Sequence, residues 1–168
     1  MKLTGTYNGK PIELELTEEQ IKVLKQAEKN ETGWERTKNP YVYYYNSYNR
    51  LGGITELGRE SDDTLFDWAN YFSDKTLAKN IIRAQTLQRK LWRRSAELCE
   101  KMDWKNSMTQ KYSFYYNYDI DDLRISCTSF CRGLEEIYFD TKEHAEQVME
   151  EFKDELIWYF TKFKSRMD

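Results

Sequence analysis

Residues 1–32 begin with alternating apolar and polar positions and continue with apolar positions at helical spacing. Residues 12–16 alternate isoleucine or leucine with glutamate, the period of a strand with one buried face. Asn8-Gly9 precedes them and predicts a tight hairpin turn, because both central positions of a type I′ turn need positive φ. Thr17 then starts a capping box ahead of helically spaced apolar residues. The pattern predicts a small hairpin followed by a helix.

Two longer units follow, and in each of them strand-like residues precede a helix. In the first unit, residues 33–104, the aromatic run 41–45 and the stretch 65–72 are typical of strands. A helix is predicted over residues 74–102, where apolar residues recur at helical spacing.

The second unit, residues 105–168, has the same order of elements. Residues 111–118 and 123–130 are predicted as two strands joined by an aspartate-rich turn, and residues 136–139 as a third short strand. Residues 141–164 have the periodicity of a helix with one apolar side.

The two units also resemble each other residue by residue. An alignment of residues 71–82 with 138–149 needs no gap, and residues 43–46 resemble 114–117 at a slightly different spacing. Four positions of the first alignment are identical: Tyr71, Phe72, Lys75 and Ala78 match Tyr138, Phe139, Lys142 and Ala145. We interpret this as an internal repeat. The alternative is that unrelated strand-to-helix junctions converged on similar residues.

Together these patterns predict one α+β domain over residues 1–168, a length that can bury a core without metal or disulfide. We expect antiparallel strands with long helices packed on one face, as a repeated strand-strand-(strand)-helix unit after the opening hairpin and helix.

Composition indicates an intracellular protein. No apolar run approaches the roughly 20 residues that span a bilayer, and the first residues lack the apolar core of a signal peptide. The three cysteines, Cys99, Cys127 and Cys131, are an odd number that fits reduced thiols. We therefore expect a cytoplasmic protein without a membrane partner.

The charge of the predicted helix over residues 74–102 is strongly positive at its start. Residues 74–94 hold seven bases and one acid, a local charge of +6. Four of the bases form a narrow stripe, the basic stripe: Lys79, Arg83, Lys90 and Arg94. The stripe is a candidate contact surface for phosphates or for an acidic protein patch. Alternatively it is a solvated face, or it pairs with acids of the same fold.

The second helix is the electrostatic opposite, because residues 135–155 hold nine acids and two bases, a local charge of −7. Glu143, Glu146 and Glu150, here called the acidic ridge, could neutralise the basic stripe or occupy a basic groove on a partner. Trp158 lies off the apolar side of this helix. It is either covered by another part of the chain or an exposed anchor for a partner.

The sequence shows no recognisable catalytic or metal motif, so we expect neither an enzyme nor a cofactor. The single histidine, His144, is predicted to be a surface residue. Cys127 and Cys131 could supply two zinc ligands, but a structural zinc site needs four and no second pair exists. The aspartates at residues 119–122 lack the glycine and distal glutamate of a calcium loop and are better explained as a polar turn.

Framework residues over residues 33–160 nevertheless resemble a known group of proteins. They comprise Trp34-Glu35-Arg36, Tyr43-Tyr44-Tyr45, Asn70-Tyr71-Phe72, Asp74-Lys75, Ala78, Ile137-Tyr138-Phe139-Asp140-Thr141-Lys142-Glu143, Ala145 and Leu156-Ile157-Trp158-Tyr159-Phe160. In this layout the chain is similar to small accessory proteins of phages and prophages of Gram-positive bacteria, including anti-CRISPR-type inhibitors.

This resemblance implies a non-enzymatic protein that binds and inhibits a host nuclease in the bacterial cytosol. The implied partner is a CRISPR effector nuclease such as Cas9, or its guide complex. Two alternatives stay open: a nucleic-acid-binding module that uses the basic helix 74–94, and a phage structural or assembly protein. The candidate partner-binding residues are Lys79, Arg83, Lys90, Arg94, Glu143, Glu146, Glu150 and Trp158.

Overall fold

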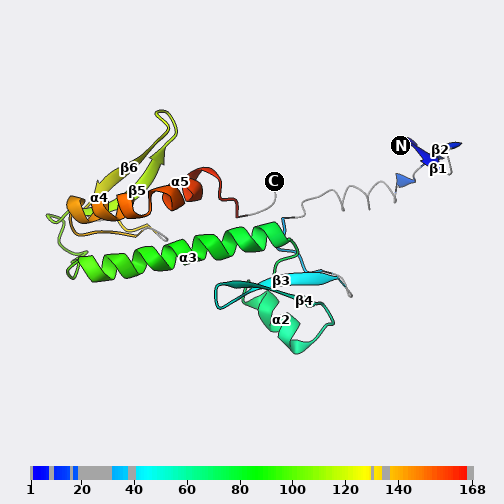
Figure 1. Cartoon of the computed structure of the whole chain (residues 1–168), viewed down its shortest axis with the longest axis horizontal. Helices are drawn as coiled ribbons and strands as arrows, with labels where there is room; N and C mark the ends of the chain where they lie inside the picture. Colours follow the sequence, from blue (N-terminus) through cyan, green and yellow to red (C-terminus); the bar gives the residue numbers. More distant parts are fainter. Residues whose placement is uncertain are drawn as a thin grey trace.

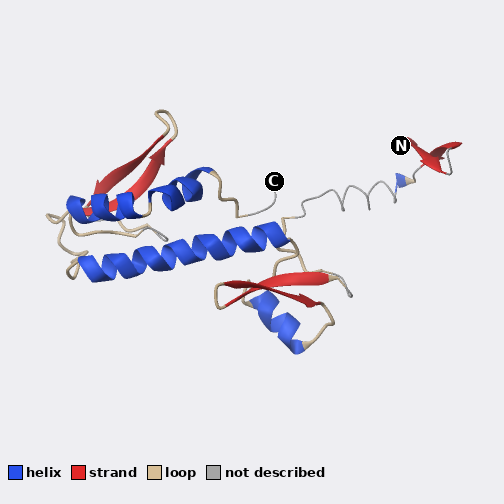
Figure 2. Cartoon of the chain, viewed as in Figure 1, coloured by secondary structure: helices blue, strands red, loops and turns tan. Residues whose placement is uncertain are grey.

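The computed structural model describes residues 2–7, 10–15, 17–18, 32–37, 41–129, 131–133 and 137–165. Its elements, in chain order, are β1 (Lys2–Tyr7), β2 (Lys10–Glu15), β3 (Val42–Ser47), β4 (Arg50–Thr55), α2 (Glu60–Asp67), α3 (Lys75–Leu98), β5 (Lys111–Asn117), β6 (Asp122–Thr128), α4 (Lys142–Glu151) and α5 (Lys153–Thr161). The α+β class is confirmed. Within the described residues, the strands form three separate two-stranded antiparallel hairpins instead of a continuous sheet (Figures 1 and 2).

The first hairpin, β1–β2, is confirmed where the alternating pattern predicted it. Leu3 pairs with Leu14, and Tyr7 with Lys10. In Figure 1 this hairpin lies apart from the other labelled elements. The helix predicted after Thr17 falls almost entirely outside the described residues.

The hairpin β3–β4 has helices on both of its faces. Tyr44 lies opposite Gly53 and packs against the start of α3, with Phe72 and Leu77. On the other face the buried ring of Tyr43 stacks on Tyr71, with 3.9 Å between ring centroids. The Tyr43 hydroxyl also donates a hydrogen bond to Asp62 of α2. Alternate residues of a strand point to opposite faces, so Tyr43 contacts α2 while Tyr44 packs against α3.

The strand predicted over residues 65–72 is wrong, because residues 65–67 end helix α2 and residues 68–69 form a turn. The first turn of α2 contains Glu60, Asp62 and Asp63, and acids at a helix N-terminus are stabilised by the helix dipole. Only Phe72 pairs with a strand, through an isolated bridge to Tyr44. The aromatic residues that suggested a strand pack instead as ring contacts, such as Phe66 against Tyr71.

Helix α3 is shared by two hydrophobic cores, one near each of its ends. Leu77 and Ile81 pack in a core with Phe72, whereas Leu87 and Leu91 pack in a larger core with residues of β6, α4 and α5. Figure 1 shows β3, β4 and α2 on one side of this helix and β5, β6, α4 and α5 on the other. Each side depends on α3 for its apolar contacts.

In the second unit, β5 and β6 form the hairpin that the sequence predicted. The helix predicted over residues 141–164 is broken into α4 and α5 at Phe152, whose backbone has φ −114° and ψ 20°. Phe152 is buried in the larger core. The third short strand predicted over residues 136–139 is reduced to an isolated bridge between Phe139 and Tyr112, and residues 134–136 lie outside the described residues.

The two strand-to-helix junctions make corresponding contacts. Phe72 exchanges two backbone hydrogen bonds with Tyr44, and Phe139 exchanges two with Tyr112, all of 2.8 to 2.9 Å. These bridges match Tyr44 with Tyr112, a different pairing from the alignment of residues 43–46 with 114–117. The contacts agree with the repeat hypothesis, although the repetition itself stays a prediction.

In the described part of the chain, none of the helices combines the length and the apolar character needed to cross a bilayer.

Candidate functional site

The basic stripe turns largely toward the second half of the chain. Arg94 Nε lies 2.9 Å from a carboxylate oxygen of Glu151 in α4, and its Nη1 lies 2.7 Å from Glu97. Hydrogen bonds to Glu97 and Glu151 raise the pKa of Arg94. One of the open alternatives, pairing of the basic stripe with acids of the same fold, is therefore observed at Arg94, although Glu151 is not part of the acidic ridge.

Two further bases of the stripe lie over aromatic rings of α5 and its start. The guanidinium carbon of Arg83 is 3.8 Å from the centre of a Trp158 ring, and Lys90 Nζ is 6.0 Å from that of Phe152. A cation over an aromatic face is attracted by the negative potential of the ring. Trp158 is half-buried beneath Arg83, so the first of its two interpretations, coverage by the chain, is the one observed.

Lys79, Arg83 and Lys90 line a groove of about 340 Å³ between the β3–β4 turn, α3 and α5. The one acid on its wall is Glu155. No described acid forms an ion pair with any of these three bases. The groove is thus a cationic recess that a phosphate or carboxylate could enter.

The acidic ridge of α4 faces solvent. Glu143, Glu146 and Glu150 are all exposed, and they lie on one side of the helix at spacings of three and four. Glu146 pairs with Lys142 at 2.8 Å and Glu150 with Lys153 at 3.4 Å. Such solvent-exposed pairs contribute little to stability, so a partner can displace the lysines at low cost.

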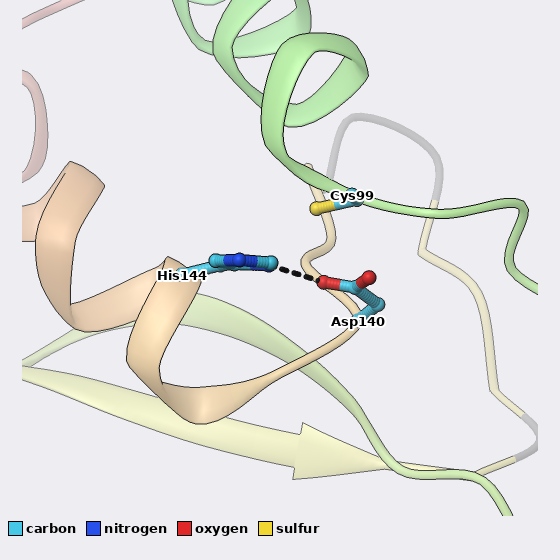
Figure 3. Close-up of side chains that lie close together, drawn as sticks. All are labelled: Cys99, Asp140 and His144. Carbon is cyan, nitrogen blue, oxygen red and sulfur yellow. Dashed lines mark hydrogen bonds and ion pairs between the residues drawn. The ribbon is translucent and has the colours of Figure 1, made fainter.

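A third cluster joins the end of α3 to the start of α4 (Figure 3). Cys99 is the C-terminal cap of α3, while Asp140 and His144 flank the N-cap Thr141 of α4. His144 Nδ1 lies 2.7 Å from Asp140 Oδ1, and the cysteine, carboxylate and imidazole atoms all lie within 4.8 Å of one another. All three residues are partly buried. His144, predicted to be a surface residue, is in fact only partly exposed, and its ring is hydrogen-bonded to Asp140.

The surroundings of this cluster keep the cysteine protonated and the aspartate ionised. Burial raises the pKa of the Cys99 thiol; a hydrogen bond with the Asp140 backbone opposes this effect, and one with the Asp140 carboxylate adds to it. Partial burial raises the pKa of Asp140, but hydrogen bonds from His144 and from the Glu100 N–H together lower it below its ordinary value. A protonated thiol is a poor nucleophile, which does not favour a catalytic cysteine.

The most deeply buried carboxylates belong to a different region, the first unit. Glu56 accepts hydrogen bonds from Arg36 at 3.2 Å and from the Tyr71 hydroxyl at 2.8 Å. The bond from Arg36 lowers the pKa of Glu56, whereas burial opposes it. Asp62, fully buried, accepts bonds from the Tyr43 hydroxyl and the Arg59 N–H. These carboxylates are satisfied within the fold, so we assign them to stability.

Sequence reasoning missed the cluster of Cys99, Asp140 and His144. One signal was present: Asp140 and His144 are four residues apart at a helix start, which places them as neighbours on one side of that helix. Cys99 carried no such signal, because it reaches the cluster only through the packing of α3 beside α4.

Comparisons of the chain with protein-family models, with curated proteins and with solved structures found no match.

Proposed function

We propose that the protein is a non-enzymatic binding protein whose contact surface is the acidic ridge of α4. This proposal rests on one difference between the two charged helices: bases of α3 contact the rest of the chain, whereas the acidic ridge of α4 faces solvent. Arg94 and Arg83 of the basic stripe contact Glu151 and Trp158 of the same chain. The acidic ridge instead projects away from the fold with only weak lysine partners.

The charge density of the ridge supports a basic partner. Residues 143 and 150 are separated by about 10 Å along the helix axis, from a rise of about 1.5 Å per residue. The three carboxylates are therefore about 4.5 and 6 Å apart along the axis, so the ridge is a row of negative charges less dense than the phosphates of one DNA strand, which follow one another about every 3.4 Å. A protein groove built for nucleic acid would attract this surface.

We propose more specifically that the basic partner is a host nuclease and that binding inhibits it. Its support is the resemblance of residues 33–160 to anti-CRISPR-type inhibitors, together with a charged ridge suited to a nucleic-acid groove. Inhibition would be stoichiometric, because the ridge blocks DNA loading by occupying the groove.

The test is binding and DNA cleavage measured with a panel of bacterial defence nucleases, including guide-loaded CRISPR effectors. The wild-type chain should bind at least one of them and slow its cleavage in proportion to inhibitor added. A variant with Glu143→Lys, Glu146→Lys and Glu150→Lys should lose both effects. A matched control reverses three exposed acids outside α4: Glu60→Lys, Asp67→Lys and Asp119→Lys. Folded wild-type chain that binds none of the nucleases contradicts this more specific proposal.

A second candidate function rests on the cationic groove lined by Lys79, Arg83 and Lys90. The side chain of Tyr48, in the adjacent β3–β4 turn, is 99% exposed and could stack on a base of single-stranded nucleic acid. In that case a gel shift should weaken steeply with salt, as counterions displaced from phosphates are released. Lys79→Glu with Lys90→Glu should abolish the shift, whereas the ridge variant should strengthen it or leave it unchanged.

A further inference from the structure

We propose that Cys99, Asp140 and His144 form a binding site for one divalent transition-metal ion, with Zn²⁺ as the expected occupant. The proposal concerns a region outside the acidic ridge and does not depend on the proposed inhibitory function.

The chemistry of the three side chains matches that of zinc. Zn²⁺ is bound in proteins by cysteine sulfur, histidine nitrogen and carboxylate oxygen, and this cluster offers one of each. Hard ions such as Mg²⁺ and Ca²⁺ prefer oxygen ligands alone. On binding, the Cys99 thiol gives its proton to the solvent and the resulting thiolate coordinates the ion. His144 must also give up the proton that its Nδ1 donates to Asp140, so that the neutral ring carries its proton on Nε2 and Nδ1 can coordinate. A fourth position would remain for water or for an atom from a partner.

The geometry requires only small movements. Zinc bonds of about 2.0 to 2.3 Å place neighbouring ligand atoms of a tetrahedral site about 3.3 to 3.6 Å apart. His144 Nδ1 and Asp140 Oδ1 are 2.7 Å apart, and every pair among the three ligand atoms is within 4.8 Å. The hydrogen-bonded pair would open by several tenths of an ångström, while the sulfur would approach. Figure 3 shows the three side chains directed toward a common space.

The other strand-to-helix junction gives an independent observation. Ser73 and Leu77 stand there in the places that Asp140 and His144 occupy, as counted from the helix N-caps Asp74 and Thr141. That junction makes the same bridge to a strand and the same N-cap hydrogen bond without a carboxylate or an imidazole at these positions. A junction of this kind therefore folds without an aspartate–histidine pair. Because the fold does not require Asp140 and His144, we assign them to metal binding.

A metal ion here would connect two elements that hydrogen bonds already bring together. Cys99 ends α3, and Asp140 precedes α4, so the ion would fasten the end of one helix to the start of the next. Because the ion binds the folded chain, it should raise the midpoint of thermal unfolding as its concentration rises.

The experiment is a titration of the metal-free full chain with Zn²⁺, using a competing chelator to set the free concentration. We expect one ion per chain. Co²⁺ in place of Zn²⁺ should give the intense ultraviolet absorption of a thiolate–metal bond. Cys99→Ser and His144→Leu should each weaken binding by more than about 100-fold, because even loss of residues that only support a ligand costs about 10- to 100-fold.

Matched controls come from the other thiols. Cys127→Ser and Cys131→Ser remove exposed cysteines outside the cluster, so they should leave affinity and the Co²⁺ spectrum unchanged. Circular dichroism checks that each variant is folded. If Cys99→Ser does not fold, the variant with Asp140→Ser and His144→Leu takes its place, since it copies the residues of the other junction.

The outcomes separate a metal site from a hydrogen-bond cluster. Stoichiometric binding that is lost in the Cys99 and His144 variants and kept in the Cys127 and Cys131 variants supports the proposal. A folded wild-type chain that binds neither ion overturns it, and so does binding that depends on Cys127 or Cys131 instead. Failure of the nuclease assays would not affect either result.

Discussion

The two strand-to-helix junctions share a backbone arrangement but differ in side-chain chemistry. At each junction a buried tyrosine and phenylalanine precede a helix, the phenylalanine bridges a tyrosine of the nearby hairpin, and a polar residue caps the helix. The cap hydrogen bond is 2.6 Å from the Leu77 N–H to Asp74 and 3.1 Å from the His144 N–H to Thr141.

The difference lies in the polar groups around this shared arrangement. Near the first junction, Tyr71 donates to the buried carboxylate of Glu56, within a network that is complete inside the fold. At the second junction, Asp140 and His144 meet Cys99 in a partly open position. The polar groups of both junctions are hydrogen-bonded within the fold, but only the second junction places a carboxylate and an imidazole beside a cysteine, the set of groups that we propose binds a metal ion.

The largest expected effect comes from the feature that both junctions share. Phe72→Ala and Phe139→Ala each remove a buried ring and leave a cavity, which should cost about 3–5 kcal/mol of unfolding free energy. Urea unfolding followed by circular dichroism measures both. If one substitution costs less than about 1 kcal/mol, that ring has no structural role equivalent to its counterpart, and the comparison fails.

The dependence of stability on acid pH should also differ between the two regions. The folded pKa values of Glu56 and Asp62 lie below their ordinary values, for Asp62 mainly through the hydrogen bond from the Arg59 N–H. A lowered folded pKa stabilises the protein above the unfolded pKa, about 4, and this contribution is lost as pH falls through the folded pKa.

The corresponding measurement is unfolding free energy between about pH 6 and pH 2, a range that brackets ordinary carboxyl pKa values. Wild type should lose stability below about pH 4 more steeply than Asp62→Asn, which cannot ionise there. Asp140→Asn should flatten the curve less than Asp62→Asn does. If Asp140→Asn flattened the curve more than Asp62→Asn, the ionisation of Asp140 would contribute more to stability than that of Asp62, which contradicts this prediction.

The tyrosine hydroxyls provide a smaller contrast. Tyr71→Phe removes the hydrogen bond to the Glu56 carboxylate together with the bonds with the Thr37 N–H and hydroxyl. It should cost at least about 1.5–3 kcal/mol, the range for one bond to a charged group. Tyr138→Phe removes a bond from the Gly133 N–H and should cost about 0.5–1.5 kcal/mol. Thermal unfolding of the two variants compares them, and equal losses would show that the buried carboxylate adds nothing at Tyr71.

The helix caps should behave alike at the two junctions. Asp74→Ala and Thr141→Ala each remove the acceptor for a backbone N–H, at a cost of about 0.5–2 kcal/mol. Asp74→Asn and Thr141→Ser are the matched controls, since asparagine and serine can still accept this hydrogen bond. Unfolding in urea measures all four, and a conservative variant as destabilised as its alanine counterpart would argue against the cap.

Local patterns predicted the elements whose signals lie within a few residues. Alternation predicted the hairpin β1–β2, an aspartate-rich turn between two strand-like stretches predicted the hairpin β5–β6, and helical periodicity predicted α3. The stretch of residues 65–72 failed because its aromatic residues suggested a strand, while the acids before it start a helix. Aromatic content alone does not separate a strand from a helix that packs its rings.

The candidate sites could be predicted only in part. The opposite charges of α3 and α4 could be counted in the sequence. The contact of Arg83 with Trp158 could not be predicted, because it depends on how distant segments pack. The same limit applies to Cys99, which the sequence separates widely from His144. Packing between helices, unlike periodicity along one helix, leaves no local pattern to detect.

We infer that the second junction folds without the Asp140 and His144 side chains that we assign to metal binding. The most direct test is the thermal unfolding midpoint of the Asp140→Ser, His144→Leu variant, measured with a chelator present. The loss of the hydrogen bonds that the partly exposed Asp140 carboxylate accepts from His144 and Glu100 should cost about 1.5 kcal/mol, the low end of the range for charged groups, so the midpoint should stay within about 6 °C of wild type. A decrease of more than about 10 °C, or roughly 3 kcal/mol for a chain of this size, would show that Asp140 and His144 are structural and would contradict the account.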